Sequence, residues 1–185
     1  MWNFVAIQSC SGHLDMKLAR TIRFDPSDLK VFPKAADEGE WALVGTFCFS
    51  GISESDLTGQ VKQAFSNGFL GLSSFGFSTL VSVSTAKIEH LEAIENLLAE
   101  RFIREFGAPD EKTARAAACE EIGFMADLCS EHKTGTLLAI QRRWTNDGIA
   151  ETFRSLPKPD SCAEQKIWTI VEDDQIQDTS GPHGA

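Results

Sequence analysis

The stretch Val61-Lys-Gln-Ala-Phe-Ser-Asn-Gly-Phe-Leu-Gly-Leu-Ser-Ser-Phe-Gly-Phe-Ser-Thr-Leu-Val-Ser-Val83 decides how this chain folds. Its first residues place Val61, Ala64 and Phe65 on one face of a helix, and its last residues alternate as a strand. A solvated loop cannot carry the apolar load between them, so the stretch is predicted to pack against the core as a helix–turn–strand junction. That load comes from phenylalanines interspersed with glycines: Phe65, Phe69, Phe75 and Phe77, with Gly68, Gly71 and Gly76.

Two helices are predicted downstream of this junction. Lys87 to Phe106 carries an apolar stripe at helical spacing, and Gly107-Ala-Pro109 ends the helix because proline cannot continue it. Asp110 is the expected N-cap of a second, alanine-rich helix that runs to about Cys129. Because the connection is short, the two helices are expected to be antiparallel neighbours in an αα-hairpin.

Apolar runs and turn signals predict the strands. Trp41 to Phe49 is apolar on both faces, which is typical of a central strand. Thr145-Asn-Asp-Gly148 is a hairpin turn signal, because Asn and Gly tolerate positive φ. The order β-β-α-β-α-α-β-β predicts an α+β fold, a mainly antiparallel sheet of about five strands with an αα-hairpin and a shorter helix packed on it. The predicted strands are Leu18–Phe24, Trp41–Phe49, Thr79–Val83, Gly135–Trp144 and Ile149–Leu156, with Val31–Pro33 as a short edge strand.

The 185 residues suit one domain with extended ends. We expect residues 1–15 to be a disordered extension, since Ile7-Gln-Ser-Cys10 lacks the basic region and the long apolar run of a lipoprotein signal. Residues 16–156 are the predicted α+β domain. Residues 157–185 are expected to be an acidic tail, in which Lys166 to Val171 is a candidate short edge strand.

Composition excludes several classes of function. A formal charge of −10 and an isoelectric point near 4.8 argue against binding to nucleic acid or to an anionic membrane surface, both of which favour a basic face. No run of about 18 apolar residues is present, so no membrane span is predicted. Five cysteines, an odd number without a C-x-x-C pair, are typical of the reducing cytoplasm.

The turn at residues 66–78 is the candidate site for a ligand or a partner. Its glycines expose backbone N–H groups, and its polar side chains lie beside apolar walls, as in many binding sites. The competing interpretation is structural: Asn67 takes the left-handed position that ends the helix, and Ser73 and Ser74 satisfy loop backbone. The candidate residues are Asn67, Gly68, Gly71, Ser73, Ser74 and Gly76.

Glu121 on the second predicted helix flanks an apolar stripe, so it is expected to be half-buried and to need a cation. Arg142 and Arg143 are consecutive in a predicted strand and point to opposite faces, so one of them is available as the cation for Glu121. We expect a structural ion pair between Glu121 and Arg143, and the alternative is a general acid or base at Glu121.

Other chemical motifs are incomplete. Gly68-Phe-Leu-Gly71 has the spacing of a nucleic-acid clamp, but its interior pair is apolar. Cys129-Ser-Glu-His132 and Cys119 lack the ligand cluster that a zinc site needs, even if His90 reaches them. The chain contains no nucleophile elbow and no dinucleotide glycine pattern. We therefore expect no metal and no cofactor.

Five short runs carry a resemblance to a known family: Lys17-Leu-Ala-Arg-Thr-Ile-Arg, Gly39-Glu-Trp-Ala, Gln63-Ala-Phe-Ser-Asn-Gly-Phe-Leu-Gly71, Ser74-Phe-Gly76 and Gly135-Thr-Leu-Leu-Ala. From Met16 to about Leu156 the chain resembles a small bacterial family of uncharacterised proteins. The resemblance implies a single domain that starts at Met16. It implies no activity, cofactor or catalytic residue.

Two classes of function remain. The first is a non-catalytic accessory or protein-interaction domain of the bacterial cytoplasm, whose partner is another protein. The alternative is an enzyme or a small-ligand-binding protein with a pocket beside the 66–78 turn. A closed apolar pocket of ligand size favours the alternative, and an exposed apolar patch favours the interaction domain.

Overall fold

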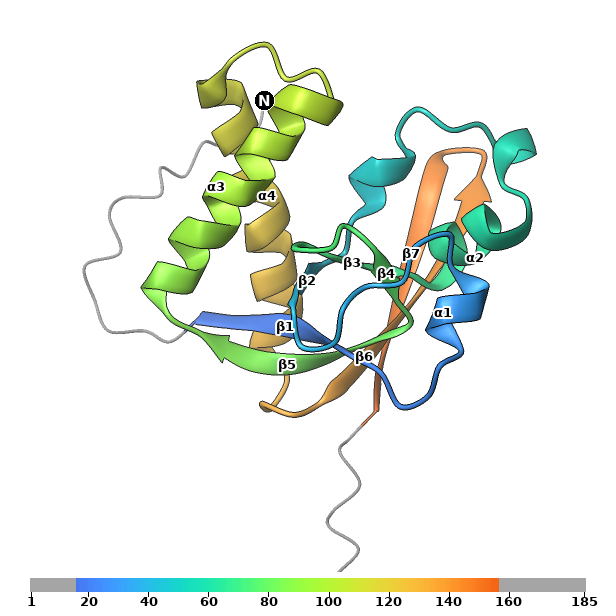
Figure 1. The fold of residues 1–185 in the computed structure, drawn as a ribbon, viewed down its shortest axis with the longest axis horizontal. Helices are drawn as coiled ribbons and strands as arrows, with labels where there is room; N and C mark the ends of the chain where they lie inside the picture. Colours follow the sequence, from blue (N-terminus) through green and yellow to red (C-terminus); the bar gives the residue numbers. More distant parts are fainter. Residues whose placement is uncertain (1–15, 157–185) are drawn as a thin grey trace, which may run out of the picture.

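An antiparallel sheet of seven strands forms the body of the protein (Figure 1). The computed structural model describes residues 16–156, and the predictions for residues 1–15 and 157–185 lie outside that range. The strands follow the order β4-β3-β2-β1-β5-β6-β7 across the sheet, and each neighbouring pair is antiparallel. They are β1 (Met16–Ile22), β2 (Trp41–Leu43), β3 (Phe69–Gly71), β4 (Phe77–Ser78), β5 (Leu80–Ala86), β6 (Leu137–Thr145) and β7 (Gly148–Leu156).

A hairpin of two long helices packs on this sheet, with α4 lying against β1 (Figure 1). The predicted cap of α4 is present, because the Asp110 carboxylate accepts a hydrogen bond from the Thr113 N–H at 2.7 Å. The α+β class and the αα-hairpin are therefore confirmed. No helix among residues 16–156 is long and apolar enough to cross a membrane. The helices are α1 (Asp28–Val31), α2 (Gly59–Asn67), α3 (Ile88–Glu105) and α4 (Glu111–Ser130), with the 3-10 helices η1 (Thr46–Phe49) and η2 (Glu54–Asp56).

The predicted strand Trp41–Phe49 ends after three residues, at Leu43. Gly45 then takes a left-handed φ of +76°, and a Cβ atom at this position would lie only 2.4 Å from the Cβ of Leu70. The chain turns there and continues as η1. Contact between neighbouring segments thus ends a strand that the apolar pattern alone would extend.

The sheet gains two strands that the sequence pattern did not predict. Residues 69–78, expected to be a turn, contain β3 and β4, which pair with each other. The expected edge strand at Val31–Pro33 is absent from this sheet, because Val31 ends α1 and Phe32 is buried in the core. The sheet therefore has seven strands in place of the predicted five.

Two clusters of buried apolar side chains stabilise the fold. The larger one lies between the helical hairpin and the strands, and it contains the fully buried Phe69. The smaller one joins α2 to η1, where the rings of Phe49 and Phe65 meet edge-on at 5.4 Å. Phe75 is half-buried and packs against Phe106, with ring centroids 6.1 Å apart. The predicted packing of the junction on the core is thus realised most fully at Phe65 and Phe69.

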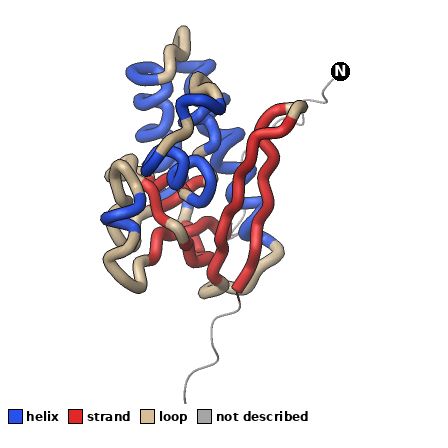
Figure 2. The backbone as a smooth tube through the Cα atoms, turned by 90° about the vertical axis from the view of Figure 1, so that its right-hand side faces the viewer, coloured by secondary structure: helices blue, strands red, loops and turns tan. Residues whose placement is uncertain are grey.

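The last two strands form a long hairpin at one edge of the sheet (Figure 2). β6 and β7 pair from Leu137 with Leu156 to Thr145 with Gly148, so the predicted turn is present. This hairpin carries Arg142 and Glu151 as a cross-strand pair. The hairpin therefore positions the polar network around Arg142 that is described below.

Candidate functional site

The predicted site at residues 66–78 is built around a carboxylate that the sequence reasoning missed. Glu40, which is buried, accepts hydrogen bonds from the N–H groups of Ser73 and Ser74 at 2.5 and 2.8 Å. Its other oxygen accepts from the Ser74 hydroxyl and from the Asp37 N–H. Ser73 and Ser74, two of the residues expected to receive a ligand, are therefore already bonded to Glu40. The sequence signal that could have pointed to Glu40 is its place in the acidic run Asp37-Glu-Gly-Glu40, which overlaps one of the family-like motifs.

The glycines of this turn allow close approach between backbone segments. A Cβ atom on Gly71 would lie 2.5 Å from the Glu40 carboxylate, and one on Gly76 would lie 2.4 Å from the carbonyl oxygen of Ala35. A Cβ on Gly68 would lie 2.7 Å from the oxygen of Ala64. Packing within the chain thus accounts for all three glycines.

Asn67 lies apart from the Glu40 cluster. It is the last residue of α2, and its side-chain amide donates to Gln63 at 3.3 Å. It does not take the left-handed conformation, which in this turn belongs to Phe75, with φ of 55°. The structure therefore gathers Gly71, Ser73, Ser74 and Gly76 near Glu40 and places Asn67 and Gly68 at the end of α2.

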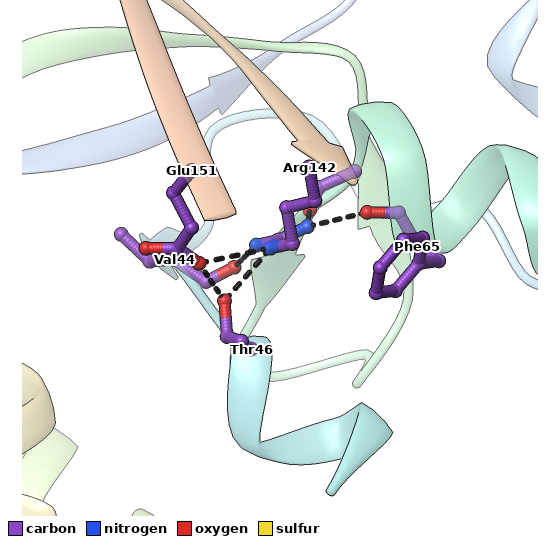
Figure 3. A network of polar contacts seen from close by, with 6 residues as sticks. Val44, Thr46, Phe65, Arg142 and Glu151 are labelled. Atoms are coloured by element: carbon purple, nitrogen blue, oxygen red, sulfur yellow. Dashed lines mark hydrogen bonds and ion pairs between the residues drawn. The ribbon is translucent and has the colours of Figure 1, made fainter. Parts of the chain in front are cut away.

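Arg142 is the centre of a second network (Figure 3). Its guanidinium is almost completely buried, and its Nε donates to the Thr46 hydroxyl at 2.7 Å and to Glu151 at 3.1 Å. Its terminal nitrogens donate to three backbone oxygens, those of Phe65 at 3.0 Å, Gly68 at 2.9 Å, and Val44. One side chain thus connects the end of α2, the segment after β2 and the last hairpin.

The buried arginine is not the one expected to pair. Arg143 is exposed, and among residues 16–156 the ion pairs include neither Arg143 nor Glu121. The pair that forms is Arg142 with Glu151, at 3.1 Å. The alternation of β6 explains the difference, because it turns Arg142 toward the core and Arg143 to solvent.

Burial governs the acid–base properties around this network. It raises the pKa of Glu121 to about 7, and the carboxylates of Glu151 and Glu120 add to that rise while Arg142 opposes it. Burial also raises the pKa of the Cys48 thiol to about 12 and lowers the pKa of Arg142. Cys48 is therefore a protonated thiol at neutral pH and a poor nucleophile. Glu121, which is affected by the charges of this network, therefore exchanges a proton near pH 7.

A cavity lies elsewhere, at the corner where β1 runs into α1. It has a volume of about 220 Å³, and the Asp28 carboxylate in its wall is only 5% exposed. That carboxylate accepts from the hydroxyl and the N–H of Thr79, at 2.6 and 3.2 Å. No ion pair of residues 16–156 includes Asp28. The lining residues are Ile22, Arg23, Phe24, Asp25, Ser27, Asp28, Thr79 and Leu80.

Exposed apolar side chains occur in the cavity wall, at Phe24, and on α1, whose first residue Asp28 also lines the cavity. Phe24 is 68% exposed, Leu29 is 58% exposed, and Val31 at the end of α1 is also exposed. We call Phe24, Leu29 and Val31 together the corner patch. Sequence reasoning missed it, because it assigned Phe24 to the strand Leu18–Phe24 and Val31 to a short edge strand. Among residues 16–156, no group of three His, Cys, Asp or Glu side chains is arranged to hold a metal ion.

Comparison with known proteins identifies a family without assigning a role. Curated proteins and solved structures gave no match. A family model, described as a family of unknown function (DUF6505), matches residues 16–172. The match starts at the residue where the family-like motifs predicted a domain start, and it continues past the end of β7. The chain therefore belongs to the DUF6505 family of unknown function.

Proposed function

We propose that this protein is a non-catalytic protein-interaction domain that binds its partner through the corner patch. The observation that carries the proposal is the pairing of exposed apolar side chains with an adjoining cavity. Phe24 and Leu29 are each more than half exposed, and Phe24 also lines the cavity. Large apolar side chains gathered beside a cavity are typical of surfaces that another protein covers.

The chemistry of the cavity selects a basic side chain as the group that enters it. Asp28 is a buried carboxylate whose bonded partners among residues 16–156 are neutral. Arg23 lines the same cavity, but its guanidinium donates to the carbonyl oxygen of Ala36. A lysine or arginine from a partner would supply the cation that a buried carboxylate normally has. The formal charge of −10 would also attract a basic partner.

The bacterial cytoplasm is the proposed setting. Cys48, Cys119 and Cys129 are free thiols, as expected of a protein kept in a reducing compartment. The turn at residues 66–78 is a weaker site for a ligand, because Glu40 already binds Ser73 and Ser74. For that reason we prefer the corner patch.

Site-specific photo-crosslinking tests the proposal. A benzoylphenylalanine residue at position 29 should crosslink one protein in cells of the native host, and the same residue at position 103 should not. Ile103 is a matched control because it is a large, exposed apolar residue on α3. The partner would then be purified and its affinity measured by calorimetry.

The affinity of the purified partner decides the outcome. Leu29→Asp and Phe24→Asp should each weaken binding at least about tenfold, since each removes an apolar contact of about 1.4 kcal/mol or more. Ile103→Asp should leave the affinity unchanged, and the three melting temperatures should agree. Equal binding by all three variants, or equal crosslinking at positions 29 and 103, would overturn the proposal.

A further inference from the structure

The two outermost strands of the sheet, β4 and β7, differ in how their outer edges are treated. Residues 34–36 cover β4, because the Phe77 N–H donates to the Lys34 carbonyl and the Ala36 N–H donates to the Phe77 carbonyl. β7, in the long hairpin of Figure 2, pairs with β6 along all nine residues, and no strand among residues 16–156 pairs with its other side. An edge of this length presents a row of free N–H and C=O groups, which folded proteins usually cover or interrupt.

β7 lacks the usual features that keep an edge strand from pairing. It contains no proline and no lysine, and its register with β6 continues without a bulge. Its one acid, Glu151, is already paired with Arg142 at 3.1 Å. The strand therefore carries no unpaired acid, although the chain has a formal charge of −10. This absence makes β7 a segment along which two copies of an acidic protein can approach each other.

Apolar side chains lie beside the open edge. Phe124 on α4 is 46% exposed, and its ring packs against the half-buried Phe153 of β7 with centroids 6.1 Å apart. Leu156, the last residue of β7, is also exposed. A strand added alongside β7 would bury more of these side chains and bond the free backbone groups together. The apolar side chains and the backbone edge therefore call for the same kind of occupant, another strand.

The hairpin turn determines which backbone groups of β7 point outward. Thr145 and Gly148 flank a two-residue turn and pair with each other. In a hairpin of this kind the flanking residues exchange hydrogen bonds, and bonded and non-bonded pairs then alternate along the strands. Glu151, Phe153 and Ser155 lie an odd number of positions from Gly148. Their N–H and C=O groups are therefore directed away from β6, toward the open edge.

We propose that this edge is the interface of a homodimer, in which β7 pairs antiparallel with β7 of a second copy about a two-fold axis at Phe153. An axis perpendicular to the sheet keeps every side chain on its own face and joins the seven strands of each copy into one sheet. Phe153 then lies opposite Phe153 of the second copy. Glu151 lies opposite Ser155, and Thr152 lies opposite Arg154. β7 shares no residue with the corner patch, so the two proposals are independent.

Side-chain chemistry selects this register over its neighbours. A two-fold axis at Glu151 or at Arg154 would place like charges directly opposite each other, which is destabilising. An axis at Thr152 would place the Glu151 carboxylate opposite the Phe153 ring. The axis at Phe153 instead pairs ring with ring and brings the Phe124 side chain of each copy beside them. Aromatic side chains then occupy the centre of the interface, where they contribute most to binding.

Sedimentation velocity of the full-length chain tests the dimer and its register. The unaltered chain should dimerise with rising concentration. Thr152→Glu should lower the dissociation constant about tenfold and Thr152→Lys should raise it about tenfold, because position 152 faces Arg154 twice in each dimer. A general effect of net charge would give the reverse order, since lysine makes this acidic chain less negative.

The matched control is Gln141, which is exposed on the same face and pairs with Thr152 from the β6 side, one strand away from the interface. Gln141→Glu and Gln141→Lys should change the dissociation constant by no more than about twofold, because solvent and salt screen charges at that distance. Thr152 is also exposed, so circular dichroism should show that all four variants remain folded.

Charge exchange and hydrogen exchange give independent readouts. Thr152→Lys combined with Arg154→Glu should restore the dimer, because the opposed charges attract again. The amides of Glu151, Phe153 and Ser155 should be better protected above the dissociation constant than below it. Three results would overturn the proposal: a monomer at every concentration, a dimer that the two Thr152 variants do not shift in opposite directions, or amide protection that is independent of concentration. The last result would mean that another part of the same chain covers the edge.

Discussion

Replacing Arg142 by methionine tests whether one buried guanidinium connects the parts of this fold. Methionine has a similar length and no charge, so the change removes the donors and keeps most of the apolar stem. The oxygens of Phe65, Gly68 and Val44 lose this donor, and Glu151 loses its ion-pair partner. Glu151 also accepts from Thr46, which retains part of its hydrogen bonding.

The expected loss of stability is large. Leaving a buried polar group without a partner costs about 1–3 kcal/mol, and breaking a buried ion pair costs about 3–5 kcal/mol. These costs overlap, and local relaxation reduces them, so we expect Arg142→Met to lower the free energy of unfolding by about 4 kcal/mol. That is a substantial part of the ~5–15 kcal/mol typical of a folded domain.

Urea unfolding followed by circular dichroism measures this loss. The control is Arg143→Met, one residue away on the exposed face, which should change the free energy by no more than about 0.5 kcal/mol. Combining Arg142→Met with Glu151→Gln should cost about 1–3 kcal/mol less than the sum of the single changes, because the orphaned charge is removed. A loss below about 1 kcal/mol for Arg142→Met, or simple additivity in the double variant, would refute the reasoning.

Three further perturbations follow from the same structure. Phe69→Ala should lower the free energy of unfolding by about 3–5 kcal/mol in urea, since Phe69 is fully buried, and a loss under about 1 kcal/mol would place its ring outside the core. Glu40→Gln should cost about 1–3 kcal/mol through its bonds to Ser73 and Ser74, whereas Glu38→Gln in the same loop should cost almost nothing; equal effects would contradict the cluster. The folded-state pKa of Glu121, about 7, is raised from 4.5, so its protonation stabilises the fold below pH 4.5 and that contribution disappears as the pH rises through 7. Glu121→Gln should therefore match the unaltered protein near pH 4.5 and exceed its stability by about 1–2 kcal/mol at pH 8, a discounted value because Glu121 is partly exposed; a difference independent of pH would refute the shifted pKa.

Local chemistry made several elements predictable. Asp110 could be identified as a helix cap, because capping depends on a side chain and a backbone N–H three residues away. The turn at Thr145–Gly148 depends on residues that tolerate positive φ, and Gly148 has φ of +115°. The αα-hairpin and the last two strands follow from such short-range signals, so the sequence by itself determined the α+β class.

Tertiary structure decided the features that depend on residues far apart in the chain. The end of β2 depends on Leu70 approaching Gly45, and the Glu40 cluster depends on a turn more than 30 residues later. The choice of Arg142 over Arg143 depends on which face of β6 meets the core, and two consecutive arginines carry no signal for that. A residue pattern records the spacing along one element, whereas these outcomes are set by the close packing of side chains and backbone from several elements at once.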